Sequence, residues 1–384
     1  MATRALSGQY DDNSLRAIAI QATVDAGTAP VLGQLQILPS TVPQPSWSNV
    51  TADSALALIP TDPKYLISTG LFGPAVPVAE TLDPKYESNF VSYADGFWLQ
   101  MGPAWETANY YDRALNHYVY WARSGDPKWF FRATALARDY RRKYIEANNY
   151  LPSPHWAQME GLALSHWLAG DDSAVAAVVR SATRLTEVYT PDIVSVGEGR
   201  ITARMVIMSL LSWELGDRSQ PWRTRLDDYV RKTISTIQQD GSYIWPNWCS
   251  GQSNYMAGML NDAMIKYYER INQDPSVITA VAASTEYMWR TQWNASVGAF
   301  RYVNKSCTAI PESEAGQIPT DLNGLILVGF AFGAKHATSP SIRAERNARV
   351  DSIAASMVDN AWIAGSKQFN QSYYYTHAYM WYRK

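Results

Sequence analysis

The pattern of apolar and polar positions in residues 155–172 predicts a helix that ends in a tight turn. His155, Met159 and Leu162 are spaced by four and three residues, which is the period of a helix. Gly170 can adopt the left-handed conformation that terminates a helix, and the aspartates that follow it can cap the next one. The stretch is therefore expected to be the first half of a helical hairpin.

The same order of features recurs along the chain. A polar start is followed by an apolar helix rich in small residues, a turn, and a second helix that carries more charge. The turns fall at residues 125–127, 170–172, 216–217, 273–275 and 338–340. A sixth helix of the first kind, at residues 372–384, has no second helix after it. Its partner is expected to come from the N-terminal region, which would close the hairpins into a ring.

Residues 1–95 lack the hairpin pattern and contain many Pro, Gly, Ser and Thr residues. Short helices are expected near residues 11–23 and 53–59. The rest is expected to be ordered, because aromatic and branched residues are scattered through it. The predicted organisation is an irregular N-terminal wrap or attachment arm over residues 1–95 and one ring-shaped catalytic domain over residues 96–384.

Three segments carry a resemblance to a known group of folds. They are YYDRALNHYVYWARSGDP at residues 110–127, HWAQMEGLALSHWLAGD at 155–171 and YMAGMLNDAMIKYYERINQDP at 255–275. Each resembles the small-residue helix and the Gly-Asp or Asp-Pro turn of the (α/α)6 toroid in six-hairpin glycosidases and toroid polysaccharide lyases. The resemblance covers about residues 100–384. It implies an all-α (α/α)6 toroid that acts on carbohydrate, without selecting one family.

Charge and motif content argue against several other classes. The chain has 33 basic and 35 acidic residues and no basic block, so nucleic acid is not an expected partner. No apolar run is long enough for membrane insertion. Neither a phosphate loop nor a zinc-spaced Cys/His cluster is present, so no metal or other cofactor is expected. The N-terminus lacks the apolar core of a signal peptide, which leaves the cytoplasm, a phage particle and secretion after signal removal open.

The expected position of the functional site follows from loop length. The turns on one side of the hairpins are short and the loops on the other side are long, and long irregular loops on one face usually carry function. Polar residues at the starts of the first-kind helices should lie at similar heights around a central funnel. They are Glu106, His155, Glu198, Asn254, Asp321 and His377. The alternative is that these residues only cap helices.

Hydrolysis of a glycosidic bond in a polysaccharide or oligosaccharide is the leading hypothesis. This reaction needs two carboxylates, one of which burial keeps protonated. Glu160 lies in an otherwise apolar helix, where a carboxylate is costly unless it is paired. Its alternative role is a buried ion pair with Arg113 or Arg204. The candidates for acid, base or nucleophile are Glu106, Glu160, Glu198 and Asp321, followed by Asp112 and Asp240.

A polysaccharide lyase is the alternative enzyme. A lyase abstracts the proton beside a uronate carboxylate, usually with Tyr or His, while Arg, Asn or His neutralises the carboxylate. Arg200 and Arg204 lie one turn apart and could serve this purpose, or could instead pair with Glu198 and Glu160. A third hypothesis is a non-catalytic glycan-binding or phage virion module. The remaining lyase parts would come from His155, Asn254, Tyr255, Tyr374 and His377.

Aromatic residues are numerous, with 15 Trp and 24 Tyr in the chain. Trp245, Trp248 and Tyr374 are candidate platforms on which sugar rings could stack, although core packing accounts for such residues as well. Cys249 and Cys307 both fall in long loops. A disulfide between them is one possibility, and two free thiols are the default expectation.

Overall fold

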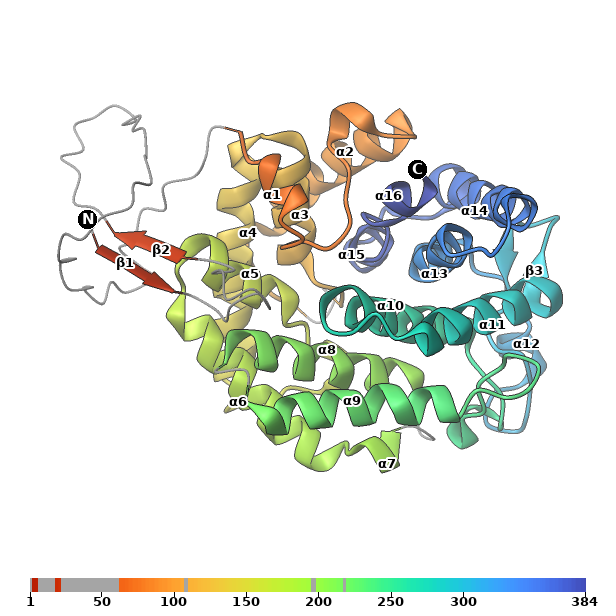
Figure 1. The fold of residues 1–384 in the computed structure, drawn as a ribbon. Helices are drawn as coiled ribbons and strands as arrows, with labels where there is room; N and C mark the ends of the chain where they lie inside the picture. Colours follow the sequence, from red (N-terminus) through yellow and green to blue (C-terminus); the bar gives the residue numbers. More distant parts are fainter. Residues whose placement is uncertain (1, 6–17, 22–61, 107–109, 195–197, 217–218) are drawn as a thin grey trace.

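The computed structural model describes residues 2–5, 18–21, 62–106, 110–194, 198–216 and 219–384. Six helices in these ranges form the inner layer of a ring, and each contacts the next (Figure 1). Because the last of them also contacts the first, the ring is closed. They are α3 (Arg113–Ser124), α5 (Glu160–Ala169), α8 (Gly199–Leu215), α10 (Asn254–Arg270), α13 (Asn323–Lys335) and α15 (Ser366–Tyr374). The predicted all-α toroid is confirmed.

Each inner helix packs against an outer helix that completes its hairpin, and α5, α8 and α13 also pack against the outer helix that precedes them. For the first five inner helices, the partner is the helix that follows in the chain. For α15 the partner is α2, which precedes the whole ring, so the expected N-terminal partner is confirmed. The single helix expected at residues 372–384 is wrong, because α15 begins at Ser366 and ends at Tyr374, and a separate short helix, α16 (Tyr379–Arg383), packs against α13. The outer helices are α2 (Pro84–Met101), α4 (Pro127–Tyr140), α6 (Asp172–Val188), α9 (Gln220–Ser235), α11 (Pro275–Gln292) and α14 (Pro340–Asn360).

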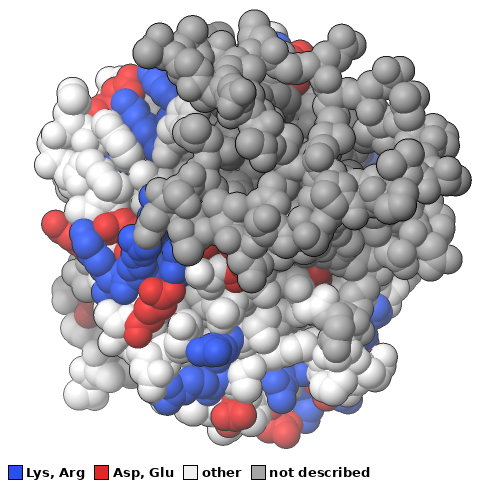
Figure 2. Space-filling model, turned by 90° about the vertical axis from the view of Figure 1, so that its left-hand side faces the viewer, with Lys and Arg blue, Asp and Glu red and all other residues white. Residues whose placement is uncertain are grey.

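The two layers differ in burial, as their sequences predict. Every residue of α13 from Asn323 to Ala334 is buried, whereas α14 buries one face that includes Val350 and Ile353. An inner helix is covered on all sides, so it can be apolar all round, while an outer helix keeps a polar face toward solvent. Figure 2 shows Lys and Arg side chains next to Asp and Glu side chains on the described part of the surface it displays.

Glycine and aspartate form the tight turns between inner and outer helices. Gly125 and Gly170 end α3 and α5 with φ of 83° and 70°, a left-handed conformation that glycine adopts without a steric penalty. Asp126 and Asp171 then accept hydrogen bonds from the first backbone N–H groups of α4 and α6. Asp274 caps α11 in the same way. These local signals explain why the hairpins are readable in the sequence.

Shorter elements connect or extend the two helical layers, and one of them, Arg141–Glu146, continues α4 directly. Two antiparallel ladders are present in the described ranges, one pairing β1 (Ala2–Ala5) with β2 (Ile18–Gln21) and one pairing β3 (Trp293–Asn294) with β4 (Ala299–Phe300). The prediction of a helix near residues 11–23 is wrong for residues 18–21, which form strand β2. The helix expected near residues 53–59 lies outside the described ranges. The remaining short helices are α1 (Tyr65–Ser68), α7 (Pro191–Val194), α12 (Glu312–Ala315) and the turns Val78–Glu80, Arg141–Glu146, Pro154–Trp156, Pro246–Trp248 and Thr320–Leu322.

The predicted domain boundary between residues 95 and 96 falls inside α2, which runs without a break from Pro84 to Met101. Composition did not reveal this helix, because its apolar positions follow a segment rich in Pro and Gly. Asp83 caps its first turn and Pro84 occupies its first position, a combination that favours a helix start. The division of the chain into an arm and a catalytic domain remains a prediction.

The long loops before α10 and α13 lie side by side, with Ser253 paired to Val303 in an isolated bridge, and β3 and α12 of the second loop are on the right of Figure 1. A disulfide between Cys249 and Cys307 joins two of these loops, with the Cα atoms 5.5 Å apart, so the default expectation of free thiols is wrong. Sequence spacing could not reveal this pairing, since 58 residues separate the two cysteines. Among the described helices, none combines the length and the apolar character that a bilayer span requires.

Candidate active site

The inner helices differ in length, and this sets the depth of the candidate residues. Helices α8 and α10 have 17 residues each, whereas α5 has 10. At 1.5 Å per residue, α8 is about 10 Å longer than α5, so its start should lie that much further from the short-turn end. The first residues of α5 and α8 therefore differ in depth, whereas the predicted entry residues His155 and Glu198 lie within 3.6 Å of each other. The candidate carboxylates lie at two levels, here called the mouth and the lower level.

The mouth contains Glu198, Arg200 and His155. Glu198 is the residue before α8, and its carboxylate pairs with the Arg200 guanidinium. The same oxygen, Oε1, lies 3.6 Å from Nε2 of His155. Burial acts to raise the pKa of Glu198, but the His155 contact and the Arg200 charge outweigh it and lower the pKa. The three side chains are 17%, 22% and 31% exposed in the order Glu198, Arg200, His155, so all remain reachable from solvent.

Aromatic rings and cations line the mouth beside this cluster. Arg200 Nη1 donates to the hydroxyl of Tyr110 over 3.4 Å, and Lys367 lies 5.5 Å from the centre of the same ring. Tyr255 and Tyr302 stack with their ring centres 5.7 Å apart, and Trp248 meets the edge of Tyr302. Flat aromatic faces next to positive charges are suited to a sugar ring that bears an acidic group.

The lower level is built around Glu160, the first residue of α5. Lys266 Nζ lies 3.0 Å from Glu160 Oε1 and 2.9 Å from Asp262 Oδ2, and the Tyr374 hydroxyl also donates to Glu160. The expected buried ion pair exists, but its cation is Lys266 rather than Arg113 or Arg204. Burial raises the pKa of Asp262 to about 6.

Sequence reasoning missed Asp262 and Lys266, although a signal was present. They lie four residues apart in α10, whose other positions in that turn are apolar or small. Charged residues at this spacing face each other on a helix, and charges inside an inner helix need partners. The pair could therefore have been recognised as pointing into the ring.

Asp112 connects α3 to α5 at the same level. Its Oδ1 accepts from the backbone N–H of Leu115 over 2.9 Å, and its Oδ2 accepts from that of Gly161 over 2.8 Å. Only glycine fits at residue 161, because a Cβ there would lie 2.4 Å from Asp112 Oδ1. Burial raises the pKa of Asp112 to about 6, against its two backbone hydrogen bonds, and the negative charge of Glu160 adds to the increase. Asp112 thus holds the start of α5, and with it Glu160, in place.

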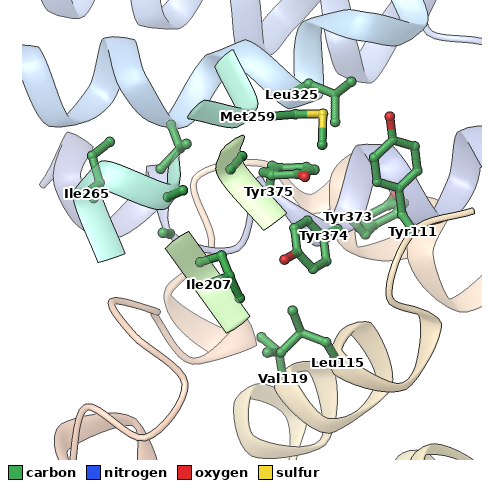
Figure 3. Packing of buried hydrophobic residues seen from close by; sticks show 14 of the residues in the cluster. Tyr111, Leu115, Val119, Ile207, Met259, Ile265, Leu325, Tyr373, Tyr374 and Tyr375 are labelled. Carbon is green, nitrogen blue, oxygen red and sulfur yellow. The ribbon is translucent and has the colours of Figure 1, made fainter. Parts of the chain in front are cut away.

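Tyrosines surround Arg204 in the centre of the ring. Figure 3 shows Tyr111, Tyr374 and Tyr375 gathered between inner-helix side chains. The Arg204 guanidinium lies 5.9 Å from the Tyr111 ring centre and 5.7 Å from that of Tyr374. Within the described part of the chain, Nε and Nη2 of Arg204 are buried without a hydrogen-bond partner. A buried guanidinium in this state is suited to binding an oxygen of an anionic ligand.

The other predicted carboxylates lie apart from the Asp112–Glu160 pair. Glu106 is exposed. Asp321 accepts from Nε2 of Gln371 over 3.1 Å, and burial raises its pKa. Gln371 lies on α15, the helix that also carries Lys367. Within the described residues, the partners of the Glu160 carboxylate are Lys266 and Tyr374 rather than Glu106 or Asp321.

Four further predicted residues are buried and have structural contacts. Asn254 is buried and bridges Gln252 Nε2 and the backbone oxygen of Arg301. His377 is buried between the backbone oxygens of Tyr374 and Phe72. Trp245 is buried, stacks on Tyr243, and touches the position where a Cβ of Gly199 would be. The structure does not fit the sugar-platform interpretation of Trp245, because only 1% of this residue is exposed. Tyr374 is buried too, and serves as a hydrogen-bond donor to Glu160.

The clusters of polar side chains at both levels are built for hydrogen bonding and ion pairing. Across the ranges that the structure describes, no group of three or more His, Cys, Asp or Glu residues is arranged to hold a metal ion.

The fold defines the class of protein to which this chain is similar. A scan against protein-family models and a search of curated protein sequences find no match. Solved structures with the (α/α)6 toroid of the unsaturated glucuronyl hydrolases do match. Their sequence identities to this chain are low, so the match shows a shared fold only. The predicted resemblance to toroid carbohydrate-active enzymes is thereby confirmed at the level of fold.

Particular structures illustrate the extent of this likeness. A mutant unsaturated glucuronyl hydrolase from Streptococcus agalactiae gives a TM-score of 0.54 at 11% identity, covering 87% of this chain and 93% of that one. A glycosyl hydrolase family 88 protein from Bacteroides vulgatus also gives 0.54 at 11% identity, covering 76% and 98%. An unsaturated glucuronyl hydrolase specific for heparin gives 0.51 at 9% identity, covering 70% and 83%.

Proposed function

We propose that this chain is a glycoside hydrolase that cleaves glycosidic bonds of an acidic oligosaccharide or polysaccharide by carboxylate acid/base chemistry. The observation that carries the proposal is the pair formed by Asp112 and Glu160 on neighbouring inner helices. The Gly161 N–H that Asp112 accepts belongs to the residue next to Glu160, so the two carboxylates are held together. Glycosidases need two carboxylates in fixed relation to each other.

The two carboxylates have different surroundings, which supports different roles. Asp112, with a pKa raised to about 6, holds a proton in weakly acidic solution and would give it to the leaving oxygen as general acid. Glu160 accepts hydrogen bonds from Lys266 Nζ and from the Tyr374 hydroxyl, which orient its carboxylate. It would act as the base or nucleophile. Water then supplies the hydroxyl group that ends on the sugar.

A substrate with a carboxylate group is supported by the cations near the two levels. Arg200 at the mouth and Arg204 in the centre both point to anion recognition, and Lys367 adds a third positive charge beside Tyr110. The solved structures of similar fold are named for unsaturated glucuronyl groups, which carry such a carboxylate. The Tyr255–Tyr302 stack offers an aromatic surface for the sugar ring.

The lyase alternative has one specific observation in its favour. Tyr255 lies within electrostatic reach of Arg200, the arrangement of a phenol base beside a carboxylate-binding arginine. However, burial raises the pKa of Tyr255 well above its usual value, against the effect of Arg200. Near neutral pH such a phenol stays protonated and has no free lone-pair anion to accept the substrate's proton, so hydrolysis is the better-supported function.

A panel of neutral and uronate-containing oligosaccharides, some ending in an unsaturated glucuronyl unit, tests the proposal. Hydrolysis is expected to produce new reducing ends and, on the unsaturated substrates, to remove the ultraviolet absorbance of the conjugated double bond. New absorbance would indicate the lyase instead. Binding without any cleavage across the panel would contradict both and favour the binding module.

Variants of the carboxylate pair test the assignment of residues. Glu160→Gln and Asp112→Asn should each lower kcat by about 10²- to 10⁴-fold while the circular dichroism spectrum stays the same. Glu106→Gln is the matched control, because Glu106 is exposed and should keep full activity. Full activity in both pair variants would remove them from the active site.

A further inference from the structure

A pocket of about 350 Å³ lies outside the ring centre, among the long loops. It is bordered by the segment that follows α9, by the loop that leads to α10, by α11 and by residues 304–305. Asp240, a secondary acid candidate in the sequence, lines this pocket. None of the pocket residues belongs to the Asp112–Glu160 pair or to the mouth. Its size is in the range of small-molecule sites.

The walls of this pocket are held in place by several contacts. The disulfide between Cys249 and Cys307 ties the two loops together on either side. Asn304 Oδ1 accepts from the backbone N–H of Gln252 over 2.8 Å, and Asn304 Nδ2 donates to the Tyr287 hydroxyl over 2.7 Å. Such a covalent and hydrogen-bonded frame forms the pocket before any ligand arrives, which lowers the ordering cost of binding.

The backbone is strained at the rim. Cys249 and Ser250 have φ of 59° and 51°, in the left-handed region that side chains other than glycine rarely adopt. Gly251 follows, and a Cβ there would lie 2.2 Å from Asn304 Oδ1, so the loop is pressed against the opposite wall. Consecutive strained residues of this kind gather at ligand clamps and active sites.

The chemistry of the lining selects a class of ligand. Gln238 and Gln239 carry amides, Asp240 a carboxylate and Lys305 an ammonium, so donors and acceptors are both present and the charges cancel. Tyr287 accepts from Asn304 and keeps its own hydrogen free to donate. A simple anion would need an excess of positive charge, whereas neighbouring hydroxyl groups, which both donate and accept, match this mixture.

We propose that this pocket is a second carbohydrate-binding site, which takes one sugar unit of a glycan through its hydroxyl groups. Ile244, 38% exposed at the edge, supplies an apolar contact for the C–H face of the ring. The ligand is a neutral portion of a sugar chain. Recognition of its hydroxyl groups does not require that the chain be cleaved.

The position of the pocket gives it a use in the proposed reaction. The 245–251 loop borders the pocket through Ser250 and Gly251, and it also carries Trp248, which packs on Tyr302. Tyr302 in turn stacks on Tyr255 at the mouth. A glycan long enough to cross this loop would contact both the pocket and the mouth, while a short one would reach only the mouth. This consequence, unlike the binding itself, rests on the proposed hydrolysis.

Binding is measured by calorimetry with the Glu160→Gln chain, titrated with neutral hexasaccharides, uronate-containing hexasaccharides and free amino acids. Adding Gln239→Ala and Lys305→Ala to this chain should weaken hexasaccharide binding at least tenfold. The matched control adds Gln220→Ala and Lys143→Ala, which alter exposed residues at other places. Equal affinity in the pocket and control variants would overturn the proposal. So would pocket-dependent binding of amino acids alone, whose opposite charges could pair with Asp240 and Lys305.

Kinetics separate this proposal from the proposed function. In the otherwise unaltered enzyme, Gln239→Ala with Lys305→Ala should raise KM for long substrates about tenfold and leave kcat and the KM for disaccharides unchanged. Pocket-dependent binding with no cleavage of any glycan would contradict the proposed function and still support the binding site. The opposite result is cleavage with the same KM for long substrates in the pocket and control variants, together with no pocket-dependent binding. That result would support the proposed function and overturn the binding site.

Discussion

Two buried carboxylates, Glu160 and Asp262, share the single ammonium group of Lys266. Burial opposes the charge of Lys266, but the two carboxylates outweigh burial and raise its pKa. Removing one partner of a mostly buried ion pair leaves an uncompensated charge in the protein interior. This costs more stability than replacing both partners by apolar residues. The Lys266 side chain is 15% exposed, so solvent compensates only a small part of that cost.

Lys266→Met is expected to lower the free energy of unfolding by about 3 kcal/mol at neutral pH. Without the ammonium, one of the two carboxylates should hold a proton to higher pH, so activity that needs ionised Glu160 should appear only at higher pH. Urea unfolding and the pH profile of kcat/KM measure the two effects. Lys143→Met, at a 60% exposed lysine, is the control and should change neither. An unshifted acidic limb in Lys266→Met would contradict this role.

The raised pKa of Asp112 predicts the other side of the pH profile. If Asp112 is the general acid, only its protonated form is active, and kcat/KM should fall as pH rises through about 6. Asp262 also has a pKa raised to about 6, so it must be distinguished from Asp112. Asp262→Asn should keep the alkaline limb, and Asp112→Asn should lose it together with most activity. Loss of that limb in Asp262→Asn alone would assign the titration to Asp262.

The contact between α3 and α5 depends on the absence of a side chain at residue 161. A Cβ there would lie 2.7 Å from the Ala114 Cβ and 2.9 Å from the Leu115 backbone nitrogen, both on α3. Since neither group can rotate away, the two helices would have to separate, and the Asp112 hydrogen bond to the Gly161 N–H would lengthen. The helix pair and the carboxylate pair are thus one structural unit.

Gly161→Ala is therefore expected to destabilise the fold by about 1–3 kcal/mol and to lower kcat, because it separates Asp112 from Glu160. Thermal unfolding and kcat are the measurements. Gly96→Ala in α2 is the matched control, since a Cβ at residue 96 would have no neighbouring atom within 4 Å and alanine favours a helix. That control should be neutral or slightly stabilising. Equal stability of the two variants would show that α3 and α5 do not meet as described.

The elements that the sequence could predict are those with local signals. Gly170 and Asp171 define their turn through their own conformation and capping, so the hairpin could be read without tertiary information. The depth of Glu160 could not, because it depends on α5 being shorter than α8. Contacts between residues distant in the sequence likewise decide three other features. They are the pairing of Glu160 with Lys266, the burial of Trp245 and the disulfide. The residue types in the sequence were enough to suggest a carbohydrate site. Which of these residues contact each other could be known only from the folded structure.

Closure of the ring joins the beginning of the described helical region to the end of the chain. Tyr86 of α2 bonds to Thr376 through its hydroxyl, and its backbone oxygen accepts from Tyr373. The seam also includes His377, which lies against backbone oxygens of Tyr374 and Phe72. Across the seam, His117 of α3 contacts aromatic rings of both α2 and α4. Two of the buried histidines therefore lie where the ring closes.

Both histidines couple ring closure to pH. Burial lowers the pKa of each to about 3, and nearby positive charge adds to this: Lys266 for His377 and Arg113 for His117. The usual value in an unfolded chain is about 6.5. Their neutral forms thus stabilise the fold fully above pH 6.5, and this contribution is lost as pH falls from 6.5 toward 3. Asp112 and Asp262 change stability with pH in the opposite direction, because their pKa values are raised in the folded protein. Their contribution to stability is greatest below pH 4, about the usual pKa of an aspartate, and it is lost as pH rises through about 6.

On acidification from pH 7 to pH 5, each histidine should cost about 2 kcal/mol of stability. The two aspartates regain part of this, because the native state takes up their protons over the same range. Replacing both histidines, as His117→Gln and His377→Gln, should leave only the aspartate contribution, so the variant should lose less stability than the parent, or gain some. Denaturant unfolding at the two pH values measures the difference. An acid-induced loss of the same size in parent and variant would mean that the seam histidines do not carry the pH dependence of the ring.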